Sequence, residues 1–190
     1  MSKDQSKSPL LGVWNARYAN NTKETLYDDP STGKIAGGFL NSPKVIDIED
    51  WGCGRGGFRK YIGAHQNYIG IDGSKTQFAS KTVSLENYTS KADAIHIRHI
   101  LEHNLNWRTI LENAVQSFTK RMVLTLFTPL QENMTILNKY DLDGVTIVDL
   151  GFSRDHIVNY FDGLKWFSIE NIKTDTEYGI EHMFFLEKTE

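Results

Sequence analysis

The chain has 190 residues and a formal net charge of −3, with 21 Lys and Arg against 24 Asp and Glu. This length suits a single domain with one sizeable core. The slight excess of acid excludes a general basic field, so nucleic acid is disfavoured as a partner. Cys53 is the only cysteine, which excludes an internal disulfide and suits the reducing cytoplasm. No apolar run approaches the roughly 20 residues that span a bilayer, so we expect no membrane segment.

The N-terminal part separates into a polar stretch and an aromatic stretch. We expect residues 1–9 to be disordered and residues 10–190 to form one domain. Trp14 and Tyr18 are one helical turn apart, which predicts an N-terminal helix within residues 10–29 that covers a site as a lid. Such aromatics serve either as core or as a stacking surface for a ligand. A second helix is predicted over residues 33–40.

The most informative segment is residues 45–57, Val-Ile-Asp-Ile-Glu-Asp-Trp-Gly-Cys-Gly-Arg-Gly-Gly. An apolar start predicts a strand over residues 45–50, and the glycines predict a tight turn before a helix over residues 56–62. This arrangement exposes backbone N–H groups at a helix N-terminus and lets a ligand approach without interference from Cβ atoms. The segment therefore predicts a ligand that contains a nucleoside.

The glycines fit two templates. Gly52, Gly54 and Gly57 match the dinucleotide pattern G-x-G-x-x-G. Gly52, Gly54 and Gly56 match G-x-G-x-G, which resembles the first motif of class I S-adenosylmethionine (SAM) dependent methyltransferases. Asp50 precedes them, and a carboxylate there would repel a pyrophosphate but attract the ammonium and sulfonium of SAM. Charge thus favours SAM over NAD, although a glycine-rich turn with no ligand stays open.

A second strand, predicted over residues 68–72, ends in a carboxylate. Asp72 follows Gly52 by about 20 residues, the distance at which a βαβ unit places an acid beside a ribose. Both SAM and NAD contain such a ribose. Asp72 therefore supports a nucleoside ligand without choosing between them.

The rest of the chain alternates between strand and helix patterns. Residues 107–118 carry one apolar stripe with helical period, and Ser153 is expected to cap a later helix. Residues 129–145 are polar, are expected to be irregular, and could close over a site. The other predicted elements are a short helix over 75–81 and strands over 82–85, 93–98, 122–127, 165–173 and 180–187.

Residues 93–104, Asp-Ala-Ile-His-Ile-Arg-His-Ile-Leu-Glu-His-Asn, resemble the fourth-strand region of the same methyltransferases, where an Asp opens a buried strand and Leu-Glu-His follows. Together with residues 45–57 and 68–74, this resemblance covers most of the chain from about residue 35. It implies a Rossmann-like α/β three-layer sandwich with a seven-stranded, mostly parallel sheet and a C-terminal antiparallel hairpin. It also implies SAM as cofactor and S-adenosylhomocysteine (SAH) as product.

The resemblance also implies roles for individual residues. The glycine loop would hold the methionine end of SAM, Asp50 its ammonium and Asp72 its ribose. Many relatives have an Asp at the position of Ser84, so the adenine assignment departs from the family pattern there. The implied cofactor-binding residues are Asp50, Gly52, Cys53, Gly54, Gly56, Asp72, Gly73, Ser84, Leu85 and Arg98, and the candidate bases are His99 and His103.

These residues also raise the hypotheses of a metal site and of a nucleophilic cysteine. His96, His99, Glu102 and His103 are metal-ligand types, but residues three apart in a strand point to opposite faces, so we expect no metal site. Cys53 has no neighbour in sequence that resembles its base, which favours a backbone contact over nucleophilic work.

The sequence thus predicts an enzyme that moves a methyl group from SAM to an oxygen or nitrogen of a small molecule or sugar. The segment Arg98-His99-Ile100-Leu101 stands where amino-group DNA methyltransferases carry Asp/Asn-Pro-Pro-aromatic, which argues against that class. An NAD(P)-dependent oxidoreductase and a non-catalytic SAM-binding partner protein stay as alternatives. Homo-oligomer formation is left open.

Overall fold

The computed structural model describes residues 9–20, 30–142 and 144–189. Helix α1 spans Pro9–Asn20, so its first residue belongs to the stretch predicted to be disordered. Residues 1–8, which make up the rest of that stretch, lie outside the described residues, as do residues 21–29 of the predicted lid.

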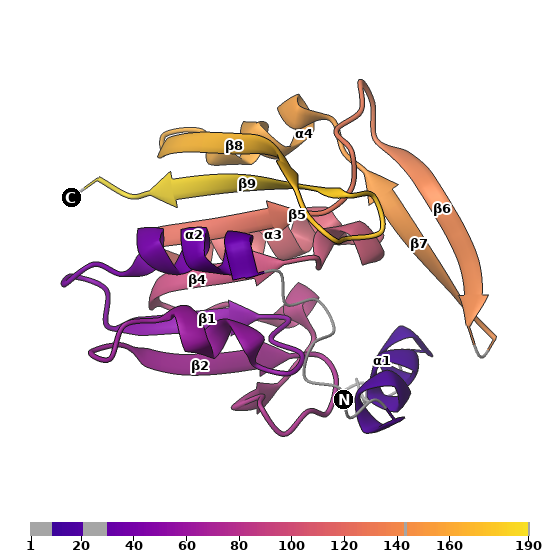
Figure 1. Ribbon diagram of the computed structural model, residues 1–190, viewed down its shortest axis with the longest axis horizontal. Helices are drawn as coiled ribbons and strands as arrows, with labels where there is room; N and C mark the ends of the chain where they lie inside the picture. The colour runs from indigo at the N-terminus through magenta and orange to yellow at the C-terminus, as the bar shows by residue number, and fades with distance from the viewer. Residues whose placement is uncertain (1–8, 21–29, 143, 190) are drawn as a thin grey trace.

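A seven-stranded sheet of order β3-β2-β1-β4-β5-β9-β8 forms the centre of the molecule (Figure 1). The strands β1 to β5 pair in parallel, whereas β9 pairs antiparallel with both β5 and β8. This confirms the predicted mostly parallel sheet with its C-terminal antiparallel hairpin. The strands are β1 (Asp47–Trp51), β2 (Asn67–Asp72), β3 (Lys81–Thr82), β4 (Ala92–Arg98), β5 (Phe118–Leu126), β8 (Lys165–Lys173) and β9 (Ile180–Glu187).

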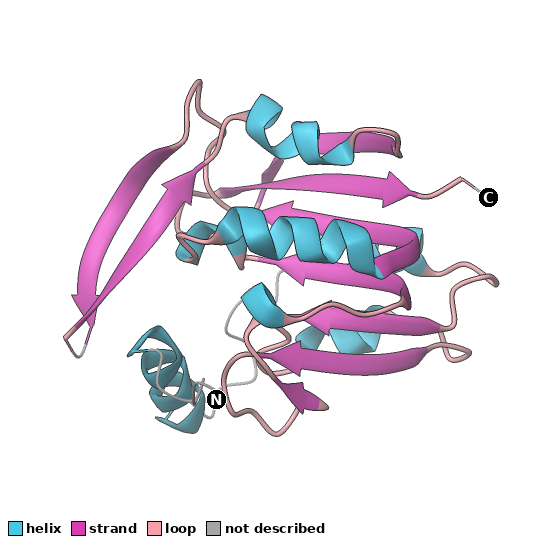
Figure 2. Ribbon diagram, turned by 180° about the vertical axis from the view of Figure 1, so that it is seen from behind, coloured by secondary structure: helices cyan, strands magenta, loops and turns pink. Residues whose placement is uncertain are grey.

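Helices cover both faces of this sheet and give three layers. Helix α2 (Pro30–Leu40) lies on one face, and α3 (Trp107–Ser117) and α4 (Arg154–Val158) lie on the other, as the opposite views of Figures 1 and 2 show. The apolar stripe of α3 packs as predicted, with Trp107, Ile110 and Leu111 buried. Each face has its own apolar core, and both strand faces are buried because the central strands pair in parallel between helices.

In the described residues, four short 3₁₀ helices connect these elements. The helix predicted over residues 56–62 is η2 (Gly57–Tyr61), and the others are η3 (Leu85–Asn87), η4 (Leu101–His103) and η5 (Asn159–Phe161). Ser153 precedes α4 as predicted, but its side chain makes no capping hydrogen bond.

The prediction of a short helix over residues 75–81 was wrong. The hydroxyl of Thr76 donates to the carbonyl of Gly54 at 2.6 Å, and the amide of Ser80 donates to the carbonyl of Gly70 at 2.7 Å. These bonds to the glycine loop and to β2 hold the segment in an irregular path with a turn at residues 77–78, and β3 begins directly after it at Lys81.

Residues 129–145 were also predicted wrongly as irregular. They include β6 (Thr135–Leu142), which pairs antiparallel with β7 (Val145–Gly151) in a separate two-stranded sheet. We call residues 135–151 the hairpin arm. Most β6 side chains are at least partly exposed, so the strand lacks the apolar alternation that sequence patterns reveal. The arm projects away from the central sheet towards α1 (Figures 1 and 2).

Within the described ranges, no helix combines the length and the apolar character that crossing a bilayer requires.

Candidate functional site

A cavity of about 610 Å³ opens at the C-terminal ends of β1, β2 and β4. This is the edge where ligands bind in open α/β sheets. Its walls come from the glycine loop, η3 and η4, from α1, from β6 of the hairpin arm, and from the β8–β9 turn. All the predicted site residues line it except Gly56, whose neighbour Gly57 does so instead; they are Asp50, Gly52, Cys53, Gly54, Asp72, Gly73, Ser84, Leu85, Arg98, His99 and His103.

The glycine loop has the left-handed backbone that its composition predicts. Gly52 has φ 77°, and a Cβ atom there would lie 2.0 Å from Cδ1 of Ile100. A side chain at this position would therefore be strained by its backbone and would collide with the cavity wall. Because glycine has no Cβ atom, the backbone of the loop can also lie close to a ligand.

Asp72 joins the second strand to this loop. One carboxylate oxygen accepts the amide of Gly54 at 2.8 Å, and the other accepts the amide of Ser74 at 2.7 Å. Burial raises the pKa of Asp72, while these two amides favour its charged form. Each oxygen retains a lone pair for a further donor, as two ribose hydroxyls would require.

Asp50 is held by side chains from both neighbouring strands. Its Oδ2 accepts the hydroxyl of Tyr68 at 2.6 Å, and its Oδ1 lies 2.7 Å from Nδ1 of His96. The ring of His96 stacks on Phe58 with their centroids 3.7 Å apart. Burial and the charge of Asp50 raise the pKa of Tyr68, so its phenol keeps the proton that it donates.

Arg98 and His99 share one buried carboxylate. Nε of Arg98 donates to Oε1 of Glu181 at 3.0 Å, and Nε2 of His99 contacts the same oxygen. Although burial raises it, the pKa of Glu181 is held below its usual value by His99 and Arg98. Burial lowers the pKa of His99 to about 4. His99 is thus neutral near pH 7 and is a weak base.

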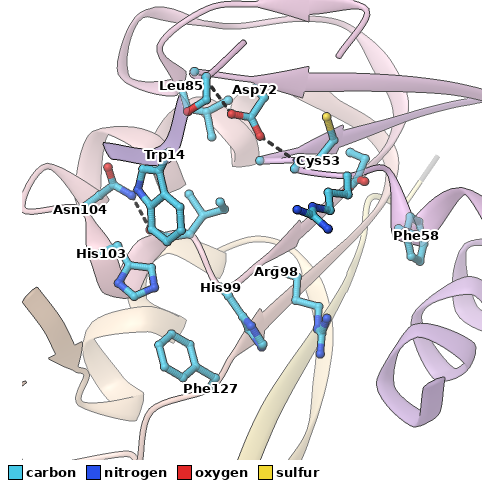
Figure 3. A pocket seen from close by; sticks show the side chains of 18 of the residues that line it. Trp14, Cys53, Phe58, Asp72, Leu85, Arg98, His99, His103, Asn104 and Phe127 are labelled. Carbon is cyan, nitrogen blue, oxygen red and sulfur yellow. Dashed lines mark hydrogen bonds between the residues drawn. The ribbon is translucent and has the colours of Figure 1, made fainter. Parts of the chain in front are cut away.

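His103 is oriented by the hairpin arm. Its Nδ1 lies 3.2 Å from the carbonyl of Val148 and 3.2 Å from Oδ1 of Asp149, and the hydroxyl of Tyr178 donates to Oδ2 of Asp149 at 3.1 Å. Both neighbours of Nδ1 are acceptors, so we assign the hydrogen to Nδ1, which leaves the lone pair on Nε2. The ring lies between Trp14 and Phe127 (Figure 3).

Burial raises the pKa of both Glu102 and Cys53. Oε1 of Glu102 accepts the amide of Phe127 at 2.6 Å, and burial raises the pKa of Glu102 to about 7. Burial, and then the charges of Asp50 and Asp72, raise the pKa of Cys53, which keeps it a thiol.

The four residues weighed as metal ligands each have a different partner. His96 contacts Asp50, His99 contacts Glu181, His103 contacts Asp149, and Glu102 accepts the amide of Phe127. In residues 9–20, 30–142 and 144–189, no group of three His, Cys, Asp or Glu side chains is arranged to hold a metal ion.

Several residues at the site were not predicted from the sequence. Arg55 and His96 line the cavity, and Asp149, Tyr178 and Glu181 stand behind its histidines. Arg55 lies inside the glycine motif. His96 lies two residues before Arg98 in the fourth strand, so the two side chains share a face. Arg55 and His96 could therefore have been inferred to face the site. The other three come from the C-terminal third of the chain and carry no local motif.

Comparison with known proteins gives a match by fold only. No family model and no curated protein matches the chain by sequence. The structure resembles magnesium protoporphyrin IX methyltransferase ChlM from Synechocystis PCC 6803, solved with bound SAM, with a TM-score of 0.59, 14% identity, and 99% of each chain covered.

Two further solved structures are similar. The N-terminal domain of EvdMO1 with SAH bound has a TM-score of 0.58 and 10% identity, covering 87% of this chain and 82% of that one. A SAM-dependent methyltransferase from Mesorhizobium loti has a TM-score of 0.52 and 11% identity, covering 77% and 94%. At these identities the likeness confirms the fold expected from the sequence, that of class I SAM-dependent methyltransferases.

Proposed function

We propose that this chain, which has the fold of class I SAM-dependent methyltransferases, binds SAM and transfers its methyl group to an oxygen or nitrogen of a small molecule or sugar. The observation that carries the proposal is the hydrogen bond from Gly54 to Asp72, which fixes the glycine loop beside a carboxylate whose oxygens retain lone pairs for ribose hydroxyls. The antiparallel β9 agrees with it, since a nicotinamide-type doubly wound sheet would end in a parallel strand.

SAM, when bound, supplies a methyl group that is already activated by the sulfonium. The protein's tasks are to hold the acceptor in line and to remove its proton. His103 is the better placed base, because the lone pair of its Nε2 is left for the cavity while the arm holds Nδ1. As the acceptor oxygen or nitrogen gains a methyl group, its proton passes to Nε2, and Asp149 stabilises the resulting imidazolium.

His99 is the weaker candidate. Its low pKa, close to 4, makes it a poor proton acceptor near neutrality, and its Nε2 already faces Glu181. We assign to it a structural role at the turn after β4.

The outer cavity suits a small acceptor with an apolar face. Trp14, Phe127 and Tyr140 line it, and Asp175 and Glu177 stand at the β8–β9 turn. These two carboxylates disfavour a polyanionic acceptor such as nucleic acid. The EvdMO1 domain was also solved in the presence of SAH and D-fucose, which is consistent with a sugar-sized acceptor in this fold.

Calorimetry with SAH and, separately, with NADH tests the cofactor. We expect SAH to bind and NADH not to bind, and binding of NADH alone would overturn the proposal. Incubation with methyl-labelled SAM and fractionated metabolites then tests the reaction. SAH binding without label transfer to any fraction would favour the non-catalytic partner protein.

A further inference from the structure

The cavity contains two buried polar atoms that the protein leaves without a partner. Nε2 of His96 and Nη2 of Arg55 have no hydrogen-bond partner among the described residues, and both side chains line the cavity. The His96 residue is 2% exposed. A buried polar atom without a partner costs free energy, so an unpaired acceptor and an unpaired cationic donor in one cavity indicate a ligand that satisfies both.

The hydrogen on His96 can be placed from its neighbours. Nδ1 faces the carboxylate of Asp50 at 2.7 Å, so Nδ1 carries a hydrogen. In the neutral ring, Nε2 then has the lone pair and is an acceptor. Asp50 is buried, and Tyr68 and His96 each bond one of its oxygens. The cavity therefore presents the His96 imidazole beside the carboxylate that the sequence had predicted to contact the ammonium.

Arg55 supplies the opposite charge. It lies between Gly54 and Gly56, whose left-handed backbone turns the loop at this point. In the described part of the chain, Arg55 forms no ion pair, whereas the other cavity arginine, Arg98, is paired with Glu181. A guanidinium with an unpaired N–H group is suited to a carboxylate.

We propose that His96 and Arg55 bind the α-amino-acid end of the cofactor, with His96 Nε2 accepting from the ammonium and Arg55 donating to the carboxylate. A cavity with one acceptor and one cationic donor is complementary to a zwitterion. Asp50 acts through His96, holding its ring with Nδ1 inward. This inference rests on the proposed SAM binding and adds residues that distinguish the amino-acid end from the nucleoside.

Four ligands separate these contacts by calorimetry. SAH has both groups, its decarboxylated analogue has only the ammonium, its deaminated analogue has only the carboxylate, and 5′-methylthioadenosine has neither. Arg55→Met should weaken SAH and the deaminated analogue by roughly tenfold to a hundredfold and leave the other two unchanged. His96→Phe, which keeps a ring against Phe58, should weaken SAH and the decarboxylated analogue instead.

Matched controls are Arg59→Met, on the exposed side of η2, and His65→Asn, at an exposed turn; neither should change any affinity. Retained binding of methylthioadenosine shows that each variant is folded. If His96→Phe does not fold, the wild type still tests the contact, since removing the ammonium from SAH must then cost at least tenfold.

Equal losses for all four ligands, or no loss for SAH, would overturn the assignment of His96 and Arg55 while leaving SAM binding intact. Failure of the wild type to bind both SAH and methylthioadenosine would overturn the proposed function itself. Weakening of the decarboxylated analogue by Arg55→Met would show that Arg55 does not act through the carboxylate and would overturn its assignment.

Discussion

Nδ1 of His103 lies 3.2 Å from Oδ1 of Asp149, so a residue of the hairpin arm orients a residue of η4, the short helix that follows β4. Although burial raises it, the pKa of Asp149 is held below its usual value by His103 and Tyr178. Asp149 is thus ionised across the neutral range and fixes the Nδ1–H tautomer of His103. Asp149→Asn should reduce the population of this tautomer, which ¹⁵N chemical shifts of the ring report directly. Asp141→Asn, exposed on the same arm, is the control; an Nε2–H tautomer in the wild type would contradict the assignment.

The two candidate bases can be compared by the same substitution. His103→Asn should lower turnover by about a hundredfold or more, the usual contribution of a general base, with little change in SAH affinity. His99→Asn should lower it far less. Asn tolerates the left-handed backbone of His99, which has φ 57°, so backbone strain does not confound the comparison. Turnover is measured as label transferred to the fraction that the wild type methylates, and a larger loss for His99→Asn would reverse the assignment.

Asp72→Ala should weaken SAH binding by about 1–3 kcal/mol, because it removes the acceptor for the ribose hydroxyls and frees the amides of Gly54 and Ser74. Calorimetry measures this loss, and thermal unfolding checks that the variant is folded. Asp47→Asn is the control, because Asp47 lies at the end of β1 that is remote from the cavity, and it should leave SAH affinity unchanged. An unaltered affinity in Asp72→Ala would mean that the nucleoside binds elsewhere.

Glu102 predicts a pH dependence of stability. Its pKa rises from 4.5 to about 7 on folding because of burial, so the native state binds the extra proton between these values. The free energy of unfolding that Glu102 contributes is therefore fully present below pH 4.5 and is lost as pH rises towards 7. Glu102→Gln should be more stable relative to the wild type at pH 8 than at pH 5, as measured by urea unfolding. A difference that is the same at both pH values would exclude this account.

Gly52 and Gly144 share a left-handed backbone but differ in surroundings. Gly144 has φ 78° with open space around it, whereas a Cβ at Gly52 would meet Ile100. Gly144→Ala should cost about 1–2 kcal/mol for its backbone alone. Gly52→Ala should cost more and should also impair SAH binding. Urea unfolding of both variants isolates the collision, and equal costs would show that Ile100 moves aside.

The elements that the sequence predicted well are those with local signals. The two C-terminal strands begin and end where predicted, since their patterns and turn residues are contained in a few positions. Asp72 was placed because its distance from the glycines follows from the length of one βαβ unit. These features depend on residues that are neighbours in the chain.

What the sequence could not supply depends on contacts across the fold. The pairing of Glu181 with Arg98 and His99 joins β9 to β4, and no spacing rule connects such distant segments. Residues 75–81 could form a helix locally, but bonds to Gly54 and Gly70 in the folded chain prevent it. The β6 strand of the arm was missed because all its side chains are at least partly exposed, so they show no clear apolar period.

The residues of the site come from two separate stretches of the chain. The loop and strand residues expected to hold the nucleoside all precede residue 105, whereas Asp149, Tyr178 and Glu181, which support the histidines, all follow residue 145. The arm pairs with itself and not with the central sheet. Its outer strand β6, whose side chains are all at least partly exposed, can therefore vary without disturbing the strands that carry Asp50 and Asp72, whereas β7 contributes Val148 and Leu150 to the core. Exchange of β6 residues that face the cavity, such as Tyr140, should therefore alter the preference for an acceptor and leave SAH affinity unchanged.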